Sequence, residues 1–405
     1  MAVSAFALCS ALLIAILLID FFHPRELLLA LKHRLPWTSA VIAWETATPE
    51  SQGMDRLKLD TLREDLAERN TRALLIVRNN KVVYEWYGQD SGPTERHGSA
   101  SLAKGLVGGM ALLVALTDGR INLDDPAWRY IPTWKDDPLK SRITIRHLAT
   151  HSSGLKNDTD DVEAESHDKD DEWKKRYRSN RSERFSIAIS QASVSQTPGS
   201  QLAYSNPGFE ALAYAVTMSL NGTPQPDIYS LLKRRIMDPL GIPEGAWQIS
   251  FGESYRTDGV KLYLVASGGS YTARAAARVG QLMLYRGNWE GRPLVDESAI
   301  EAISNVAPPV MHQPADHPAP GLGWWTNADG VWPALPRHAF VGAGSRHQLM
   351  LVVPSLDLVV VRFGESLGDT SPRALGGEYW NDAYKHLFKP LMNAVIPPPS
   401  SHATQ

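Results

Sequence analysis

The chain is short of the residues that build disulfides and thiolate metal sites. It has one cysteine, Cys9, among 405 residues, which excludes an intramolecular disulfide and a cysteine-rich metal centre. A basic surplus is also missing, because 41 Lys and Arg are outnumbered by 44 Asp and Glu, for a formal net charge of −3. Nucleic acid is therefore not expected as a partner. With 43% hydrophobic residues, the chain has enough apolar material for the core of an ordinary globular protein.

Charge is absent altogether from residues 1–19, MAVSAFALCSALLIAILLI, which Asp20 ends. A helix of this length nearly spans a hydrocarbon core, and no Ala-x-Ala pattern closes it, which favours an uncleaved anchor over a cleaved signal peptide. We interpret 1–22 as a membrane anchor or signal segment that holds the protein on the extracytoplasmic side, and 23–49 as a linker. Three basic residues follow the run: Arg25, Lys32 and Arg34. By the positive-inside rule they favour the opposite orientation, so the topology stays open.

From about residue 50 the pattern is that of a mixed α and β domain. Apolar runs on either side of a turn predict a hairpin within 71–88, with Asn79 and Asn80 at its turn, and a second hairpin within 348–364. Helical spacing dominates between them. Helices are expected over 101–117, at the start of 143–155, and over 208–221, 227–238, 272–286 and 376–394.

Strands at both ends with helices between them predict an α+β fold. We expect an antiparallel sheet flanked by helices, with an all-helical lobe inserted at about 125–250, in one domain over 50–395 followed by a tail over 396–405. The acidic stretch 158–172 lacks the central glycine and spacing of an EF-hand, and is interpreted as a solvated insertion.

The stretch SASLAKGLVGGM, 99–110, places Ser101 and Lys104 three residues apart at the expected start of a helix. Positions i and i+3 share a helix face, so the lysine amine can lie beside the serine hydroxyl, which needs a base to act as a nucleophile. Partial desolvation lowers the pKa of a lysine and makes neutral amine available. The helix N-terminus adds free N–H groups for an oxyanion. Alone, S-x-x-K is a weak signal, and a helix cap with a solvated lysine is the alternative.

Two later segments carry groups that suit the same chemistry. In LAYSNPGFEALAYAV, Tyr204 near Lys104 can lose its phenol proton in the electrostatic field of the ammonium. The phenolate can then take the serine proton and pass it to a leaving group, and Asn206 can hold the lysine or a substrate carbonyl. The alternative is a turn with a packed tyrosine and a capping asparagine. In HAFVGAGSRHQL, glycines before a strand let a ligand lie against the strand edge, where a backbone N–H can complete an oxyanion hole. The alternative there is an ordinary loop.

Together, the motifs SLAK at 101–104 and YSN at 204–206 with a glycine-rich approach to a strand resemble the serine β-lactamase and penicillin-binding-protein superfamily. The tyrosine places the likeness in the class C-like branch, with its esterases, D-aminopeptidases and 6-aminohexanoate-dimer hydrolases. The segments INLDDPAWRYIP and ITIRHLATHSSGL are also similar to passages of that family, and the resemblance covers about 50–390. It implies an acyl-enzyme on Ser101, Lys104 and Tyr204 as the proton-transfer pair, an oxyanion hole from the backbone N–H groups of Ser101 and Ser345, and no cofactor.

The third motif departs from the family pattern. Where the family has Lys-Thr-Gly or His-x-Gly, this chain has Gly342, Ala343 and Gly344 as its substrate-binding segment. The groups that help to hold a substrate carboxylate are therefore missing. Each charge-assisted hydrogen bond lost in this way should weaken the binding of a carboxylate by about 1.5–3 kcal/mol. Arg346 and His347 come after the motif, and the glycines are expected to leave room beside the strand. We therefore expect a serine hydrolase whose partner is a small uncharged ester or linear amide, with β-lactams as poor substrates.

Other functions remain open at this point. A D-Ala-D-Ala carboxypeptidase or β-lactamase-type peptidase uses the same groups, and a membrane-tethered, non-catalytic binding protein uses the same fold. Residues 364–368, GESLG, match the nucleophile elbow of α/β-hydrolases, with Asp382 and His386 downstream, but Pro372 follows where the helix should begin. Four histidines lack the spacing of zinc ligands and are interpreted as structural: His97, His147, His151 and His347. No metal site is predicted.

Overall fold

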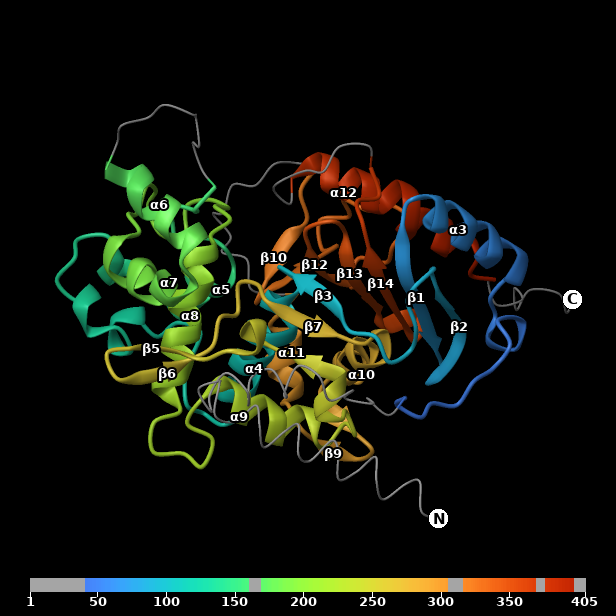
Figure 1. Cartoon of the computed structure of the whole chain (residues 1–405), viewed down its shortest axis with the longest axis horizontal. Helices are drawn as coiled ribbons and strands as arrows, with labels where there is room; N and C mark the ends of the chain where they lie inside the picture. The colour runs from blue at the N-terminus through green and yellow to red at the C-terminus, as the bar shows by residue number, and fades with distance from the viewer. Residues whose placement is uncertain (1–40, 160–168, 305–315, 369–375, 397–405) are drawn as a thin grey trace, which may run out of the picture. The chain divides into compact units, whose positions relative to one another are not determined.

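The computed structural model describes residues 41–159, 169–304, 316–368 and 376–396 (Figure 1). The predicted N-terminal apolar helix, the tail and most of the acidic insertion lie outside these residues, so the anchor and the domain boundaries stay predictions. Within the described ranges, every helix is too short or too polar to cross a bilayer.

An antiparallel sheet built from both ends of the chain organises the fold. In the described residues it has seven strands in the order β10-β11-β12-β13-β14-β1-β2, so the first strand pairs with the last. The strands are β1 (Thr71–Arg78), β2 (Lys81–Tyr87), β10 (Ala319–Gly321), β11 (Trp324–Thr326), β12 (Phe340–Gly344), β13 (Gln348–Val353) and β14 (Leu358–Gly364). Both predicted hairpins are present. Asn79 and Asn80 turn the first one with φ of 50° and 61°, the left-handed conformation that asparagine tolerates.

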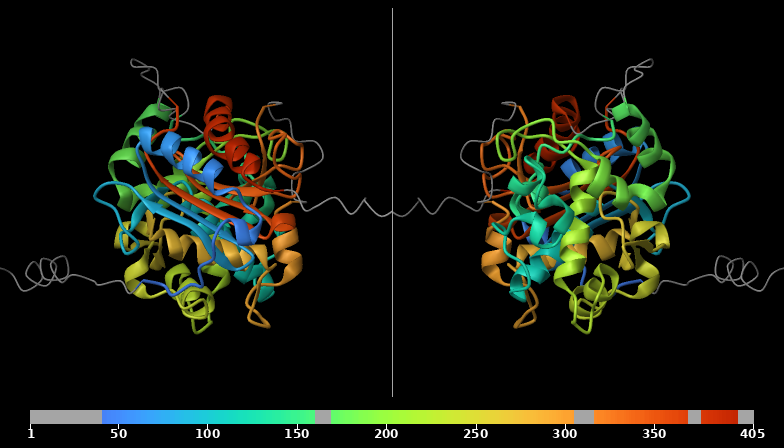
Figure 2. Two further views of the ribbon diagram at one scale, coloured as in Figure 1. Left: turned by 90° about the vertical axis from the view of Figure 1, so that its right-hand side faces the viewer. Right: turned by 90° about the vertical axis from the view of Figure 1, so that its left-hand side faces the viewer.

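Helices cover both faces of this sheet, which is why its strands are almost continuously apolar. Along β1, Ala73 and Leu75 belong to one core cluster while Leu74 and Ile76 belong to the other, as the two-residue period requires. One face is covered by α10 (Ala273–Leu284) and the other by α3 (Arg56–Glu68), α12 (Gly377–Ala383) and α13 (Lys389–Asn393). Figure 2 shows the sheet between the red and blue helices on one side and the golden and orange helices on the other.

The predicted helices appear close to their expected positions, several with a π-helical turn. The helix predicted over 101–117 is a π-helical turn, η2 (Lys104–Gly109), followed by α4 (Met110–Thr117). The other helices are α5 (Ile145–Ala149), α6 (Lys169–Ser179), α7 (Arg184–Ser186), η7 (Ile187–Gln191), α8 (Asn206–Ser219), α9 (Ile228–Leu232), η8 (Lys233–Met237), α11 (Glu297–Glu301) and η12 (Tyr384–Phe388). The remaining strands form small sheets: β3 (His97–Ala100) and β4 (Trp247–Gln248) with β7 (Gly269–Tyr271), β5 (Tyr255–Thr257) with β6 (Val260–Leu262), and β8 (Asn288–Trp289) with β9 (Arg292–Pro293).

The segment η2 is buried on all sides, and its glycines explain how. A Cβ on Gly109 would lie 2.4 Å from the carbonyl oxygen of Leu322, and one on Gly105 would lie 3.0 Å from the ring of Trp324. Only a helix without side chains at these positions can approach this close. The glycines after Lys104 therefore let the lysine sit deep in the molecule.

A buried arginine ties the end of β14 to the turn between β12 and β13. The guanidinium of Arg362 is fully buried and donates to the carbonyl oxygens of Arg346 at 2.9 Å and His347 at 3.0 Å, and to the Thr71 hydroxyl at 2.9 Å. Arg346 and His347 both have positive φ, of 60° and 55°. The arginine thus holds a strained turn that begins at Ser345.

We predict that Arg362→Met lowers the free energy of unfolding by about 3 kcal/mol, because the buried carbonyl groups lose their donors. Urea unfolding followed by circular dichroism measures it. The control is Arg292→Met, whose side chain is 62% exposed and 3.9 Å from Glu290, and which should cost less than about 0.5 kcal/mol. Equal losses in the two variants would contradict the assignment.

Candidate active site

Ser101 and Lys104 lie together as their spacing predicts. Ser101 follows β3 directly after Ala100, which has a φ of 46°, unusual for a residue with a Cβ. This bend turns the chain from the strand into η2, and strain of this kind is concentrated at functional sites. The Nζ of Lys104 lies 3.3 Å from the Oγ of Ser101, and the lysine is only 3% exposed.

The amine of Lys104 is held by groups from three separate segments. Besides Ser101, its Nζ donates to the Oδ1 of Asn206 at 2.7 Å and to the carbonyl oxygen of Ala266 at 2.8 Å. Burial lowers its pKa to about 7, with Glu210 and Asp158 acting in the opposite direction and Arg184 in the same one. The site therefore makes neutral amine available near neutral pH.

Tyr204 completes the group. Its phenol hydrogen-bonds with Ser101, and its ring centroid lies 4.7 Å from the Nζ of Lys104. Burial raises the pKa of Tyr204, and the hydrogen bond with Ser101 offsets this only in part. The phenol is therefore protonated at neutral pH. The side chains of Ser101, Lys104 and Tyr204 thus lie together, although Tyr204 is about a hundred residues away from the other two in the sequence.

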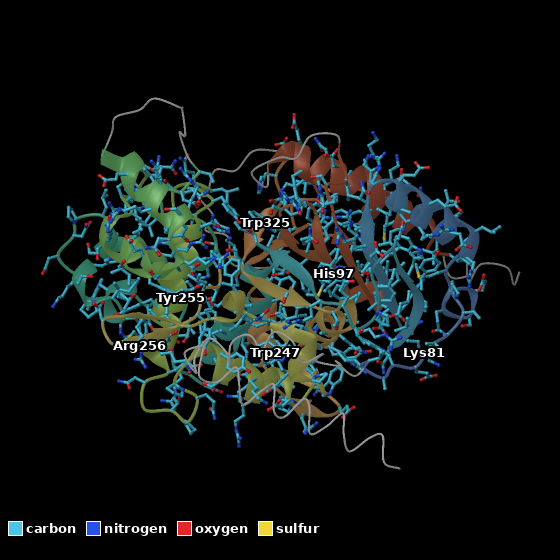
Figure 3. The ribbon with its side chains drawn as sticks, in the orientation of Figure 1. Lys81, His97, Trp247, Tyr255, Arg256 and Trp325 are labelled. Carbon is cyan, nitrogen blue, oxygen red and sulfur yellow. The ribbon has the colours of Figure 1, made fainter. Side chains whose placement is uncertain are left out.

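Aromatic rings hold Tyr204 in place. His151 stacks on it at 4.3 Å, and its Nδ1 accepts a hydrogen bond from the backbone N–H of Ser205 at 3.2 Å. Burial keeps the pKa of His151 well below its usual value, so the ring is neutral. Behind it, Trp325 stacks on His151 at 5.7 Å; Figure 3 shows this tryptophan where the sheet meets the helices on the left.

Asn206 is fixed by the start of α8 and by Asp158, an acidic residue that we expected to be solvated. The Ser205 hydroxyl caps α8 by accepting from the N–H of Gly208 at 2.9 Å. The Nδ2 of Asn206 donates to Asp158 at 2.8 Å, which leaves its Oδ1 for Lys104. Asp158 is 6% exposed, so the first residue of the acidic stretch is part of the site and not of a solvated insertion. The sequence did not indicate that Asp158 is buried, because a run of acidic residues is typical of a solvated surface.

The glycines of β12 let this strand approach the Ser101 turn closely. A Cβ on Gly344 would lie 2.3 Å from the carbonyl oxygen of Ser99 and 2.9 Å from the backbone nitrogen of Ser101, and one on Gly342 would lie 2.4 Å from Leu102. The protein itself fills the space on the side-chain face of these two glycines, and a ligand at the edge of the strand stays a prediction. These glycines let the strand end pack against the Ser101 turn, which places the exposed Ser345 beside it.

Of the two candidate replacements for the missing third-motif cation, His347 is buried and neutral, and Arg346 is exposed in an ion pair. His347 is buried, its Nε2 lies 3.0 Å from the carbonyl oxygen of Tyr379, and its Nδ1 accepts from the N–H of Leu367. Burial lowers its pKa to about 4, so it is neutral. Arg346 pairs instead with Glu365 at 3.2 Å.

The alternative nucleophile and the metal site gain no support from the described residues. The Oγ of Ser366 is buried without a hydrogen-bond partner, and His386 bonds to Asp65 at 3.1 Å rather than to a serine. A nearby hollow of about 500 Å³ between α3 and the C-terminal helices contains none of the site residues. Within the ranges that the structure describes, His, Cys, Asp and Glu side chains form no group suited to a metal ion.

Comparisons with known proteins agree with this architecture. An uncharacterised protein of Alkalihalophilus pseudofirmus is 26% identical over 75% of this chain and 86% of its own length. The 6-aminohexanoate-dimer hydrolase of Paenarthrobacter ureafaciens is 26% identical over 69% of this chain and 70% of its length. The solved structure of a putative 6-aminohexanoate-dimer hydrolase from Bacillus anthracis has a TM-score of 0.60 at 23% identity, over 86% of this chain and 89% of that one.

The family model described as Beta-lactamase matches residues 59–385. Because this match spans most of the sequence, the chain belongs to the beta-lactamase family and is a hydrolase of that fold.

Proposed function

We propose that this hydrolase cleaves small uncharged esters or linear amides through an acyl-enzyme on Ser101. The observation that carries the proposal is the contact of 3.3 Å between the Ser101 hydroxyl and an amine whose pKa is about 7. A serine hydroxyl becomes an effective nucleophile only beside a base. Such a contact has no purpose in a non-catalytic binding protein, which argues against that alternative.

Lys104 is the base in this proposal, because hydrogen-bond acceptors other than Ser101 already take the hydrogens of its neutral amine. Two of its partners, the carbonyl oxygens of Asn206 and Ala266, can only accept hydrogen bonds. In the neutral amine these two take both hydrogens, and the lone pair is left for the Ser101 hydroxyl. Lys104 therefore accepts the serine proton as Oγ bonds to the substrate carbonyl carbon.

Tyr204 acts as an acid here and not as the phenolate that the sequence suggested. Since burial raises its pKa, the neutral phenol donates its proton to the leaving oxygen or nitrogen, and the ammonium of Lys104 then restores that proton. The serine proton ends on the leaving group, and the amine is neutral again when water attacks the acyl-enzyme. The backbone N–H groups of Ser101 and Ser345 are proposed to stabilise the oxyanion.

The substrate class is inferred from charge. The third motif has no cation, His347 is buried and neutral, and Arg346 is engaged by Glu365. A substrate carboxylate therefore lacks its usual partner at this strand. The name of the 6-aminohexanoate-dimer hydrolase supports a linear amide as the bond that is cleaved, but not the absence of charge, because such a dimer carries a carboxylate itself. Muropeptides rank second and β-lactams third, and attachment to the extracytoplasmic side of a membrane remains part of the proposal.

We expect Ser101→Ala to lower kcat/KM for p-nitrophenyl butyrate by at least about a thousandfold and to abolish labelling by a fluorophosphonate, because the nucleophile is removed. The matched control is Ser366→Ala, which deletes a buried hydroxyl that has no hydrogen-bond partner among the described residues and should leave both readouts unchanged. The reverse pattern would move the nucleophile to the GESLG segment.

The pH dependence follows from the lysine. A base acts only when deprotonated, so kcat/KM for the same ester should be constant above the Lys104 pKa of about 7 and fall about tenfold per pH unit below it. Initial rates between pH 5 and 9, corrected for spontaneous hydrolysis, measure this. A flat profile through neutral pH would exclude Lys104 as the base.

The missing cation predicts weak β-lactam turnover. Nitrocefin should be hydrolysed with a kcat/KM at least about tenfold below that of p-nitrophenyl butyrate, because the loss of even one charge-assisted hydrogen bond of about 1.5 kcal/mol costs about that factor. Comparable values for the two substrates would refute the proposed preference for uncharged acyl groups.

A further inference from the structure

Glu210 is a buried carboxylate that the proposed chemistry does not use. It lies on α8 one turn after Asn206 and is 0% exposed. Its oxygens accept hydrogen bonds from the backbone N–H groups of Val265 at 3.1 Å and Ala266 at 3.3 Å. In the described part of the chain, no hydrogen bond joins it to a cationic side chain. Burying a carboxylate without a hydrogen bond to a cation costs free energy of folding, and the position of Glu210 near Lys104 suggests what the carboxylate contributes.

Glu210 is connected to Lys104 through one peptide segment. Ala266 donates its N–H to Glu210, and its carbonyl oxygen accepts from the Nζ of Lys104 at 2.8 Å. The same helix supplies Asn206, whose Oδ1 binds the amine at 2.7 Å. One face of α8 thus controls both acceptors that direct the hydrogens of Lys104.

We propose that Glu210 is a positioning residue that holds the 265–266 backbone, keeps the amine of Lys104 directed at Ser101, and sets the pH range in which that amine acts. This inference rests on the proposed role of Lys104 as the base.

The charges around the two groups support the coupling. Lys104 and Arg184 favour the carboxylate of Glu210, while Glu210 and Asp158 favour the ammonium of Lys104. Two buried titratable rings also lie near these groups: Tyr177 senses the charge of Glu210, and His151 senses that of Lys104. Burial keeps both rings neutral. Burial brings the pKa of Glu210 up to about 7, in the range where Lys104 titrates, so each group senses the charge of the other.

The test uses two variants of Glu210 and one control on the same helix. Glu210→Gln removes the charge and one of the two acceptors, while Glu210→Asp keeps the charge on a shorter side chain. Thr217→Val is the control, since this 3% exposed hydroxyl bonds only to the carbonyl oxygen of Ala213 within α8. Circular dichroism and thermal unfolding establish which variants fold, and kcat and kcat/KM for p-nitrophenyl butyrate are then measured from pH 5 to 9.

We expect Glu210→Gln to lower kcat and to move the acid limb of kcat/KM to lower pH by about one unit, because the lysine loses an attractive charge. Glu210→Asp should lower kcat but keep the acid limb of the wild type, and Thr217→Val should match the wild type in both. A folded Glu210→Gln variant whose acid limb does not move, or a control that moves equally, overturns the proposal.

A second measurement does not need an active variant. Because coupling between two sites is reciprocal, Lys104→Met should raise the pH at which the infrared carbonyl band of a buried carboxylic acid appears. An unchanged titration in this variant overturns the proposal even if both Glu210 variants unfold. If Ser101→Ala stays active, the proposed function fails while the infrared result still decides the coupling. If Ser101→Ala is inactive but the Glu210 profiles do not move, only this inference fails.

Discussion

The burial of one lysine amine is the constraint on which the site depends. An amine removed from water must have its hydrogens accepted, and here the acceptors come from the start of α8 and from the loop before β7, more than a hundred residues away from Lys104. Those acceptors leave one direction around the nitrogen, and Ser101 occupies it. The same burial lowers the lysine pKa to about 7, so geometry and protonation state have a common cause.

The rest of the fold makes that burial possible. Glycines in η2 let the helix pack against Leu322 and Trp324, which carries Lys104 into the interior. Gly344 lets the end of β12 reach the backbone of Ser101, and Arg362 holds the strained turn that follows. The central sheet therefore supports the nucleophile's turn, which packs against the end of β12.

Burial also divides the roles of the two titratable side chains beside the serine. The same desolvation that lowers the pKa of a lysine raises that of a tyrosine, since in each case the charged form is disfavoured. An acid and a base thus coexist at neutral pH in one site. His151, neutral and stacked on Tyr204, contributes position without adding charge.

Local patterns in the sequence determined much of this protein. Both hairpins follow from apolar runs on either side of turns, and the Ser101–Lys104 contact follows from a spacing of three on a helix, because each depends on residues close in the chain. Only the tertiary structure decided the rest. Asp158 was interpreted as part of a solvated charge run, the close packing of Gly342 and Gly344 against the Ser101 turn was not predicted, and Glu210 and Ala266 gave no signal. Their roles depend on which distant segments exclude water from the same few atoms, and the pKa and packing of a buried group are set by those neighbours rather than by its own motif.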